Sequence, residues 1–275
     1  MRIYTKSGDL AFSTFTFPDG QPHFKLETFE HDFSRVTIET SIKSPLELFQ
    51  LGLAVDVLRN NGFSEVNLDI RYFLGARMDR AIDSLQPNTL QSVAKYINSL
   101  GLSKVRILDV HSDVALRLIR NSENVLPLNV VEQVIAQFPH CTIAIPDKGA
   151  VDRVMKVTRG PSGYIRDVVY CSKVRDMATG KLSGFSVDRG PGRPFSALII
   201  DDICDGGGTF VGLAKELRKA GAKTVNLFVT HGIFSKGPEL EGIDKMFTTD
   251  SYWEKGSRSS ASGHLVVIPI SMKEL

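Results

Sequence analysis

Three aspartates, three glycines and a threonine follow an apolar run at residues 198–210 (LIIDDICDGGGTF). Glycines let several backbone N–H groups converge on one anion, a following helix adds the positive end of its dipole, and the Thr209 hydroxyl can donate another hydrogen bond. Asp201 and Asp202, at the end of the apolar run, suit ribose hydroxyls or a hydrated Mg²⁺ ion. The segment predicts a phosphate site; the alternative is a glycine-rich turn capped by aspartates.

Helices and strands alternate around this segment. Helices are predicted over 45–60, with Ser44 as N-cap and Pro45 at the first helical position, and over 88–100 and 210–220, which end at Gly101 and Gly221. Strands are predicted over 2–5, 65–72, 104–110, 141–145, 197–200 and 224–229. This alternation is typical of βαβ units with a mainly parallel sheet, and it occurs twice. We therefore predict an α/β protein of two tandem domains, 1–126 and 127–275.

Residues 177–194 (MATGKLSGFSVDRGPGRP) combine glycine, proline and charge. Long segments of this kind without regular structure are usually functional or disordered. We expect a mobile loop here.

The composition excludes several classes of partner. Lysine and arginine number 33 against 31 acids, and a net charge of +2 gives no general reason to expect nucleic acid or a membrane surface as partner. The sequence has neither the apolar core of a signal peptide nor about 18 consecutive apolar residues. Three cysteines without a CxxC pair argue against a disulfide framework or a zinc cluster. These features predict a cytoplasmic protein.

Several segments together resemble the ribose-phosphate diphosphokinases (PRPP synthetases), and the resemblance covers nearly the whole chain. The DGGGT segment resembles the ribose-phosphate loop of the type I phosphoribosyltransferase fold. The others are FPDGQ at 17–21, YFLGARMDR at 72–80, DVH at 109–111, PDKG at 146–149, SKVR at 172–175 and VTHGIFS at 229–235. The resemblance implies two phosphoribosyltransferase-like domains, an N-terminal one that binds ATP and a C-terminal one with the catalytic loop and the ribose-phosphate loop.

The implied reaction moves the diphosphate of Mg-ATP to the C1 hydroxyl of ribose 5-phosphate, which yields PRPP and AMP. The resemblance assigns ATP binding to Phe17, Asp19, Gln21, Arg77, Asp79 and His111. It assigns catalysis to Lys173, Arg175 and His111, and metal binding to Asp109, His111 and Asp147. Ribose phosphate is assigned to Asp201, Asp202, Asp205, Gly206, Gly207, Gly208 and Thr209. It also implies Mg²⁺ as cofactor, nucleotide biosynthesis as the setting and a homo-oligomer.

Each assignment has a plainer structural alternative. Residues 17–21 would alone be interpreted as a turn, Asp147 as a helix N-cap, and the Lys173 segment as a solvated basic turn. A single histidine such as His111 is more often structural than catalytic.

The chain also departs from the family pattern. Gly206 stands where the family has threonine, which removes a donor and predicts open space that favours a larger acceptor. The alternative acceptor is then ADP-ribose, as in the PRPP-synthetase-like ADP-ribose pyrophosphate synthetases of phage NAD⁺ salvage. Met78 replaces a glutamine, and the family's first and last helices have no counterpart at 6–16 and after 268. Oligomer contacts and a regulatory ADP site are expected to differ.

Two rival functions come from other classes. A phosphoribosyltransferase that consumes PRPP would explain DGGGT but not Arg77, His111 or VTHGIFS. A non-catalytic regulatory homologue would share the fold without the activity, but Lys173 and Arg175, which it would be expected to lose, are both present.

Overall fold

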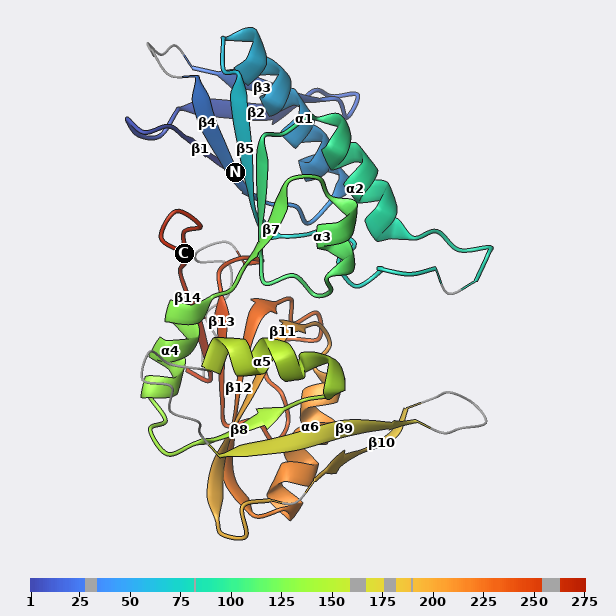
Figure 1. Ribbon diagram of the computed structural model, residues 1–275, viewed down its shortest axis with the longest axis vertical. Coiled ribbons are helices and arrows are strands. Elements are labelled where there is room, and N and C mark those ends of the chain that lie inside the picture. The colour runs from blue at the N-terminus through green and yellow to red at the C-terminus, as the bar shows by residue number, and fades with distance from the viewer. Residues whose placement is uncertain (28–33, 82, 159–166, 176–181, 189, 254–262) are drawn as a thin grey trace. The chain divides into compact units, whose positions relative to one another are not determined.

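The computed structural model describes residues 1–27, 34–81, 83–158, 167–175, 182–188, 190–253 and 263–275. The chain divides into two compact units, Met1–Val125 and Leu126–Leu275. Each unit is an α/β structure with its own sheet and its own core (Figure 1). The predicted fold class is confirmed.

Unit 1 is a five-stranded sheet with helices and a separate hairpin. Its elements are β1 (Arg2–Tyr4), β2 (Phe12–Thr16), β3 (Pro22–Leu26), β4 (Arg35–Ser41), α1 (Pro45–Asn60), β5 (Glu65–Tyr72), α2 (Thr89–Ser99), β6 (Lys104–Leu108), α3 (Val114–Leu118) and β7 (Ser122–Val125). The strand order is β1-β4-β5-β6-β7, and only β1 runs antiparallel to its neighbour. Strands β2 and β3 form the separate hairpin.

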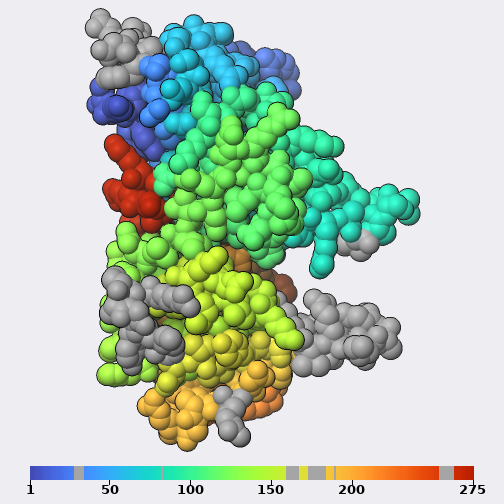
Figure 2. All heavy atoms as spheres, viewed as in Figure 1, coloured from blue at the N-terminus to red at the C-terminus, as the bar shows by residue number. Residues whose placement is uncertain are grey.

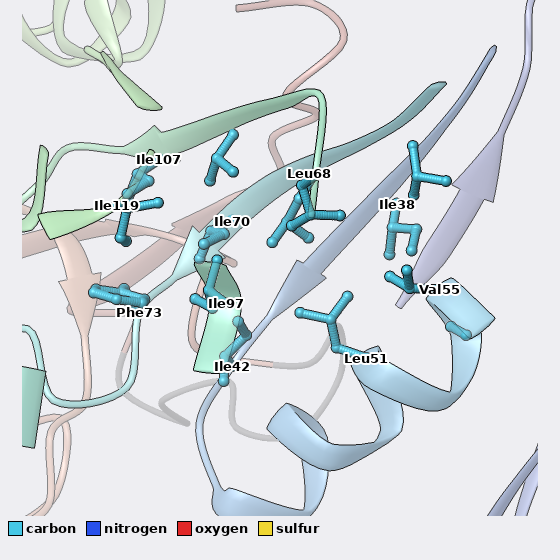
Figure 3. Packing of buried hydrophobic residues seen from close by; sticks show 14 of the residues in the cluster. Ile38, Ile42, Leu51, Val55, Leu68, Ile70, Phe73, Ile97, Ile107 and Ile119 are labelled. Atoms are coloured by element: carbon cyan, nitrogen blue, oxygen red, sulfur yellow. The ribbon is translucent and has the colours of Figure 1, made fainter. Parts of the chain in front are cut away.

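Helix α1 has the predicted bounds, and its start follows from local chemistry. The Ser44 hydroxyl accepts a hydrogen bond from the Glu47 N–H at 3.3 Å, and the Glu47 carboxylate accepts one from the Lys43 N–H at 2.6 Å. This reciprocal arrangement satisfies amides that lack partners inside the helix. Side chains from α1 and α2, among them Leu51 and Ile97, then pack against the apolar face of the sheet (Figure 3).

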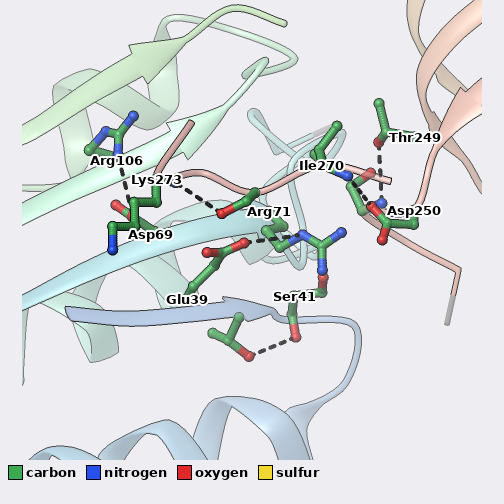
Figure 4. Close-up of polar contacts among 12 residues, drawn as sticks. Glu39, Ser41, Asp69, Arg71, Arg106, Thr249, Asp250, Ile270 and Lys273 are labelled. Atoms are coloured by element: carbon green, nitrogen blue, oxygen red, sulfur yellow. Dashed lines mark hydrogen bonds and ion pairs between the residues drawn. The ribbon is translucent and has the colours of Figure 1, made fainter. Parts of the chain in front are cut away.

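The two faces of this sheet differ because side chains alternate along a strand. Ile38, Leu68 and Ile107 belong to the apolar core, whereas the residue beside each of them is charged. The charged residues are paired across neighbouring strands in one row: Arg2, Glu39, Asp69, Arg106 and Glu123. Figure 4 shows Arg106 beside Asp69, with an N–O distance of 3.3 Å. One sheet face is therefore apolar and the other carries an ionic row.

Unit 2 is built on a seven-stranded sheet. Its elements are α4 (Leu128–Ala136), β8 (Thr142–Ile145), the 3₁₀ turn η1 (Lys148–Ala150), α5 (Val151–Thr158), β9 (Val168–Arg175), β10 (Leu182–Val187), β11 (Phe195–Cys204), α6 (Gly208–Lys219), β12 (Ala222–Gly232), β13 (Lys245–Thr249) and β14 (Leu265–Ile268). The order is β10-β9-β8-β11-β12-β13-β14, and all neighbours are parallel except β10 and β9.

Helices cover both faces of this sheet, so its central strands are apolar on both sides. Ile199 and Leu227 pack in the cluster that contains α6, whereas Ile200 and Phe228 pack with residues of α4 and α5. This explains why residues 197–200 of β11 are a continuous apolar run rather than an alternating one.

Two expectations about element bounds are corrected. Strand β11 runs to Cys204, so Asp201 and Asp202 lie within the strand rather than after it. Residues 182–187, expected to be part of a mobile loop, form β10, which pairs with β9 in an antiparallel hairpin. Residues 176–181 and 189 of that expected loop lie outside the described residues.

The other structural expectations concern cysteines and membranes. Cys141, Cys171 and Cys204 are buried, and none of these three is in a disulfide. Within the described ranges, none of the helices combines the length and hydrophobicity that a membrane span requires.

Candidate functional site

Four parallel strands of unit 2 end at one edge of its sheet, because β8, β11, β12 and β13 are direct neighbours. Asp147 follows β8, Asp201 and Asp202 lie near the end of β11, and His231 lies near the end of β12. Ligands of open α/β sheets bind at such carboxyl ends. This edge is the candidate site of unit 2.

The glycine loop joins β11 to α6 in a form that suits an anion. Gly207 is the N-cap of α6 with φ +74°, and as a glycine it has no side chain that could accept a hydrogen bond from the first turn. Among the described residues, the N–H groups of Gly206, Gly208 and Thr209 have no acceptor. Unpaired amides at a helix N-terminus, together with the helix dipole, form a favourable phosphate site.

Asp201 and Asp202 share a restricted environment. Asp202 is 7% exposed, and its N–H donates to the Asp201 carboxylate at 2.9 Å. Burial and then the neighbouring Asp202 charge hold the pKa of Asp201 well above its usual range, while Arg153 partly offsets them. The free protein therefore holds a carboxyl group whose ionised form is unfavourable until a cation or a hydrogen-bond donor arrives.

Asp201→Asn should stabilise the ligand-free protein at neutral and higher pH. A raised folded-state pKa means that stability is lost as pH rises from the ordinary aspartate pKa through the folded-state pKa. The gain in melting temperature should therefore be absent near pH 3 and grow with pH until Asp201 is ionised in both states. Scanning calorimetry in EDTA at several pH values measures it. A gain that is the same at every pH would contradict this cause.

Asp147 is a helix N-cap, which was the structural alternative to metal binding. Its Oδ1 accepts hydrogen bonds from the N–H groups of Gly149 at 3.0 Å and Ala150 at 3.2 Å, at the start of η1. This fixes the carboxylate at the carboxyl end of β8. Metal binding by Asp147 stays a prediction.

Arg153 was missed from the sequence. It lies on α5, donates to the Thr230 hydroxyl on β12 at 3.4 Å and favours ionisation of Asp201. His231, which belongs to the VTHGIFS segment and has no assigned role of its own, is 3% exposed. Its Nδ1 is 2.8 Å from the Ser251 hydroxyl. Helix periodicity gives no sign that α5 presents an arginine to β12, because that contact depends on how the helix packs.

Lys173 and Arg175 lie in β9 beyond the edge of the main sheet. The register between β8 and β9 ends at the pair Ile145 and Tyr170, so the backbone of Lys173 is about 10 Å further along the strand. There β9 continues as an arm with β10 (Figure 1). Phe185 of β10 packs against the core cluster of α6. The side chains of Lys173 and Arg175 lie outside the described structure.

In unit 1, four of the candidate residues follow two neighbouring parallel strands, β5 and β6. Arg77 is exposed in the turn after β5, and Asp79 is partly buried. Part of the chain between β5 and α2 projects from the unit (Figure 2). After β6, Asp109 is 1% exposed with φ +46°, and His111 is exposed. A non-glycine residue with positive φ is uncommon and often marks a functional turn.

The segment 17–21 forms the turn of the β2–β3 hairpin. The Phe17 N–H donates to the Gln21 carbonyl at 2.8 Å, and the Gln21 N–H donates to Asp19 Oδ1 at 3.0 Å. Phe17 is 41% exposed, and its ring lies 4.9 Å from that of Phe15 and 5.8 Å from that of His23. The structure thus shows the predicted turn and an exposed aromatic cluster on it.

The predicted metal ligands fall in different units. Asp109 and His111 belong to unit 1 and Asp147 to unit 2. In the part of the chain that the structure describes, no three histidine, cysteine, aspartate or glutamate residues cluster as metal ligands would. The donor type nevertheless fits Mg²⁺, since Asp201, Asp202 and Asp147 offer carboxylate oxygens and Mg²⁺ completes its shell with waters and substrate phosphates.

Comparisons with known proteins show which enzymes the chain resembles. No family model matches the chain. It is 28% identical to the ribose-phosphate pyrophosphokinase of Thermococcus kodakarensis over 89% of this chain and 86% of that protein. The enzyme of that name from Pyrococcus furiosus is also 28% identical, over 83% and 80%. The resemblance found in the sequence is confirmed as homology.

The fold has a solved counterpart. The phosphoribosylpyrophosphate synthetase of Mycobacterium smegmatis superposes with a TM-score of 0.76 at 19% identity, over 94% of this chain and 86% of that structure. This comparison confirms the two-domain phosphoribosyltransferase-like fold.

Proposed function

We propose, on the premise that this chain is a homologue of the ribose-phosphate pyrophosphokinases, that it transfers the β,γ-diphosphate of Mg-ATP to the C1 hydroxyl of ribose 5-phosphate. The observation that carries the proposal is the loop from Asp205 to Thr209. It combines a helix N-terminus with a glycine N-cap and amides that have no acceptor among the described residues, and it follows Asp201 and Asp202 near the carboxyl end of β11. A phosphorylated ribose would bind with its phosphate on the loop and its hydroxyls at Asp201 and Asp202.

The chemistry is a displacement at the β-phosphorus. The C1 oxygen forms the new bond, the bond between the β-phosphorus and the bridging oxygen of the α-phosphate breaks, and AMP leaves with that oxygen. The C1 hydroxyl proton passes to solvent or a neighbouring base. Positioning and charge neutralisation dominate such transfers, which suits a site that supplies amides, carboxylates and cations rather than a nucleophile.

Each candidate residue then has a proposed role. Lys173 and Arg175, on the β9–β10 arm, stabilise charge on the transferred diphosphate. Arg77 and His111 bind ATP phosphates, and Asp79 supports the same turn. Asp109 and His111 are proposed Mg²⁺ ligands of unit 1, and Asp147 is a proposed Mg²⁺ ligand of unit 2. In either unit the ion would neutralise triphosphate charge.

Phe17 is proposed to stack on adenine, with Asp19 and Gln21 hydrogen-bonding the base. Phe17→Ala should raise KM for ATP roughly tenfold, in line with stacking worth about 1–3 kcal/mol per base. KM for the acceptor should stay within about twofold. The matched control is Phe49→Ala, which removes another exposed phenylalanine, 48% exposed on α1. Equal KM values for ATP in the Phe17 variant and the unsubstituted chain would remove the role.

ADP-ribose is the second candidate acceptor. It would carry its diphosphate on the same loop, and it rests on the glycine at position 206, where the related enzymes were expected to have threonine. The product would be ADP-ribose pyrophosphate.

One assay separates these functions. The full chain is incubated with Mg-ATP and either ribose 5-phosphate or ADP-ribose, and AMP and the sugar product are followed by chromatography with mass detection. AMP release that requires ribose 5-phosphate supports a PRPP synthetase, and release that requires ADP-ribose supports the alternative. Release with neither would favour a non-catalytic homologue. A cytoplasmic homo-oligomer in nucleotide biosynthesis is proposed on the same homology.

A further inference from the structure

The space beside Gly206 contains the side chain of Lys236. A Cβ built on Gly206 would lie 3.3 Å from Lys236 Cε, 3.4 Å from Cδ and 3.6 Å from Cγ. The expectation that glycine leaves open space at this position is therefore wrong. The aliphatic part of Lys236 covers Gly206, and its ammonium group is one bond beyond the carbon that lies nearest to the loop.

The backbone holds Lys236 in this place. After β12, the N–H groups of Ile233 and Phe234 donate to the Cys204 carbonyl at 2.8 and 3.2 Å, and the Ser235 N–H donates to the Asp205 carbonyl at 3.2 Å. The turn after β12 is thus tied, residue by residue, to the start of the glycine loop.

Phe234 adds a constraint that is unusual for its residue type. It is fully buried with φ +47°, and its ring packs edge-on against Trp253 at 5.9 Å. A Cβ on Gly232 would overlap that ring. A left-handed conformation of a bulky residue persists only where its surroundings enforce it. This conformation turns the chain so that Lys236 returns over Gly206.

The charges around the loop explain what Lys236 can add. The loop offers amides and one hydroxyl but no cation of its own, and its first residue, Asp205, is acidic. Lys236 is exposed and hence open to a ligand. Its ammonium can donate to an oxygen of the phosphate that the amides bind.

We propose that Lys236 is a specificity-determining residue that binds the phosphate on C5 of the acceptor ribose. It takes the place of the side-chain donor that Gly206 lacks. This inference rests on the proposed function, because it assumes that the acceptor phosphate binds at the glycine loop. The phosphate can be the terminal group of ribose 5-phosphate or the first group of the ADP-ribose diphosphate, and the two acceptors are separate arms of the test.

The test uses Lys236→Met, which keeps most of the aliphatic contact with Gly206 and removes the charge. Initial rates of AMP release are measured with each acceptor at saturating Mg-ATP. KM for the working acceptor should rise about tenfold, which is the size expected for one charge-assisted hydrogen bond. KM for ATP should be unchanged and kcat should stay within about twofold. Lys236→Arg should restore KM to within about threefold of the unsubstituted value.

The control is Lys223→Met. Lys223 is also exposed but lies at the amino end of β12, away from the carboxyl end that leads to the loop, and its substitution should change no constant. Increasing salt should weaken acceptor binding less in the Lys236→Met chain than in the unsubstituted one, because one screened attraction is missing. A purely structural role would not change this salt dependence.

The outcomes distinguish the two levels of the argument. Unchanged acceptor KM in Lys236→Met, with AMP release intact, would overturn the role of Lys236 and leave the proposed function standing. If no acceptor supports AMP release, the proposed function fails, and calorimetric titration with ribose 5-phosphate and ADP-ribose then tests Lys236 directly. The inference would be overturned if Lys236→Met and the unsubstituted chain bound an acceptor with equal affinity. It would also be overturned if the unsubstituted chain bound neither ribose 5-phosphate nor ADP-ribose.

Discussion

Lys173→Ala should lower kcat for AMP release roughly 100- to 1,000-fold, the loss that follows removal of one preorganised group from a charged transition state. Affinity for Mg-ATP should change little, because the lysine is proposed to act on charge that develops during transfer rather than on the bound nucleotide. Its backbone supports this assignment, since it lies in β9 beyond the last residue pair with β8 and at the start of the β9–β10 arm. Single-turnover rates and nucleotide titration measure the two effects separately.

Position 223 again provides the control: Lys223→Ala removes a lysine elsewhere in unit 2, and it should retain full activity. If Lys173→Ala weakens ATP binding by the same factor as it lowers kcat, the lysine has a binding role instead. Unchanged turnover would remove Lys173 from the mechanism and leave it as a residue of β9 without a part in catalysis.

Gly207→Ala should destabilise unit 2 strongly. Gly207 has φ +74°, and a Cβ there would overlap the side chain of Leu240. The left-handed conformation costs alanine about 1–2 kcal/mol and overpacking adds about 1–3 kcal/mol. Together they predict a fall in melting temperature of roughly 5–15 °C, at about 2–4 °C per kcal/mol for a unit of this size. Scanning calorimetry measures it.

The neighbouring glycine provides a close control. Gly208 is the first residue of α6, and a Cβ there meets no atom within 4 Å. Gly208→Ala should therefore keep or slightly raise the melting temperature, since alanine is the better helix former. Similar losses in both variants would mean that the conformation of Gly207 and its contact with Leu240 do not set the requirement for glycine.

Sequence patterns predicted the secondary structure correctly where it depends on local chemistry. The bounds of α1 follow from Ser44, Pro45 and the Asn61-Gly62 end, and those of β5 from an apolar and polar alternation. Residues 198–210 predicted a strand, a glycine turn and a helix in the right order. These features are local because caps, turn glycines and side-chain periodicity act over a few residues.

Contacts between elements could not be predicted in this way. Strand β10 was assigned to a loop because its glycine and serine content conceals a strand that exists through pairing with β9. Arg153 reaches Thr230 only because α5 packs on the sheet beside β12. The ionic row of unit 1 depends on the register of five strands, which no single strand contains.

The glycine loop separates the two kinds of information most clearly. The sequence by itself determined the type of site, since Asp201, Asp202 and the glycines must follow one another to form a strand end and a phosphate turn. Only the tertiary structure decided what fills the space beside Gly206. Lys236 is 30 residues further along the chain, and it reaches the loop because β12 pairs with β11 and the buried left-handed Phe234 turns the chain back. Such a contact depends on packing, and periodicity carries no record of it.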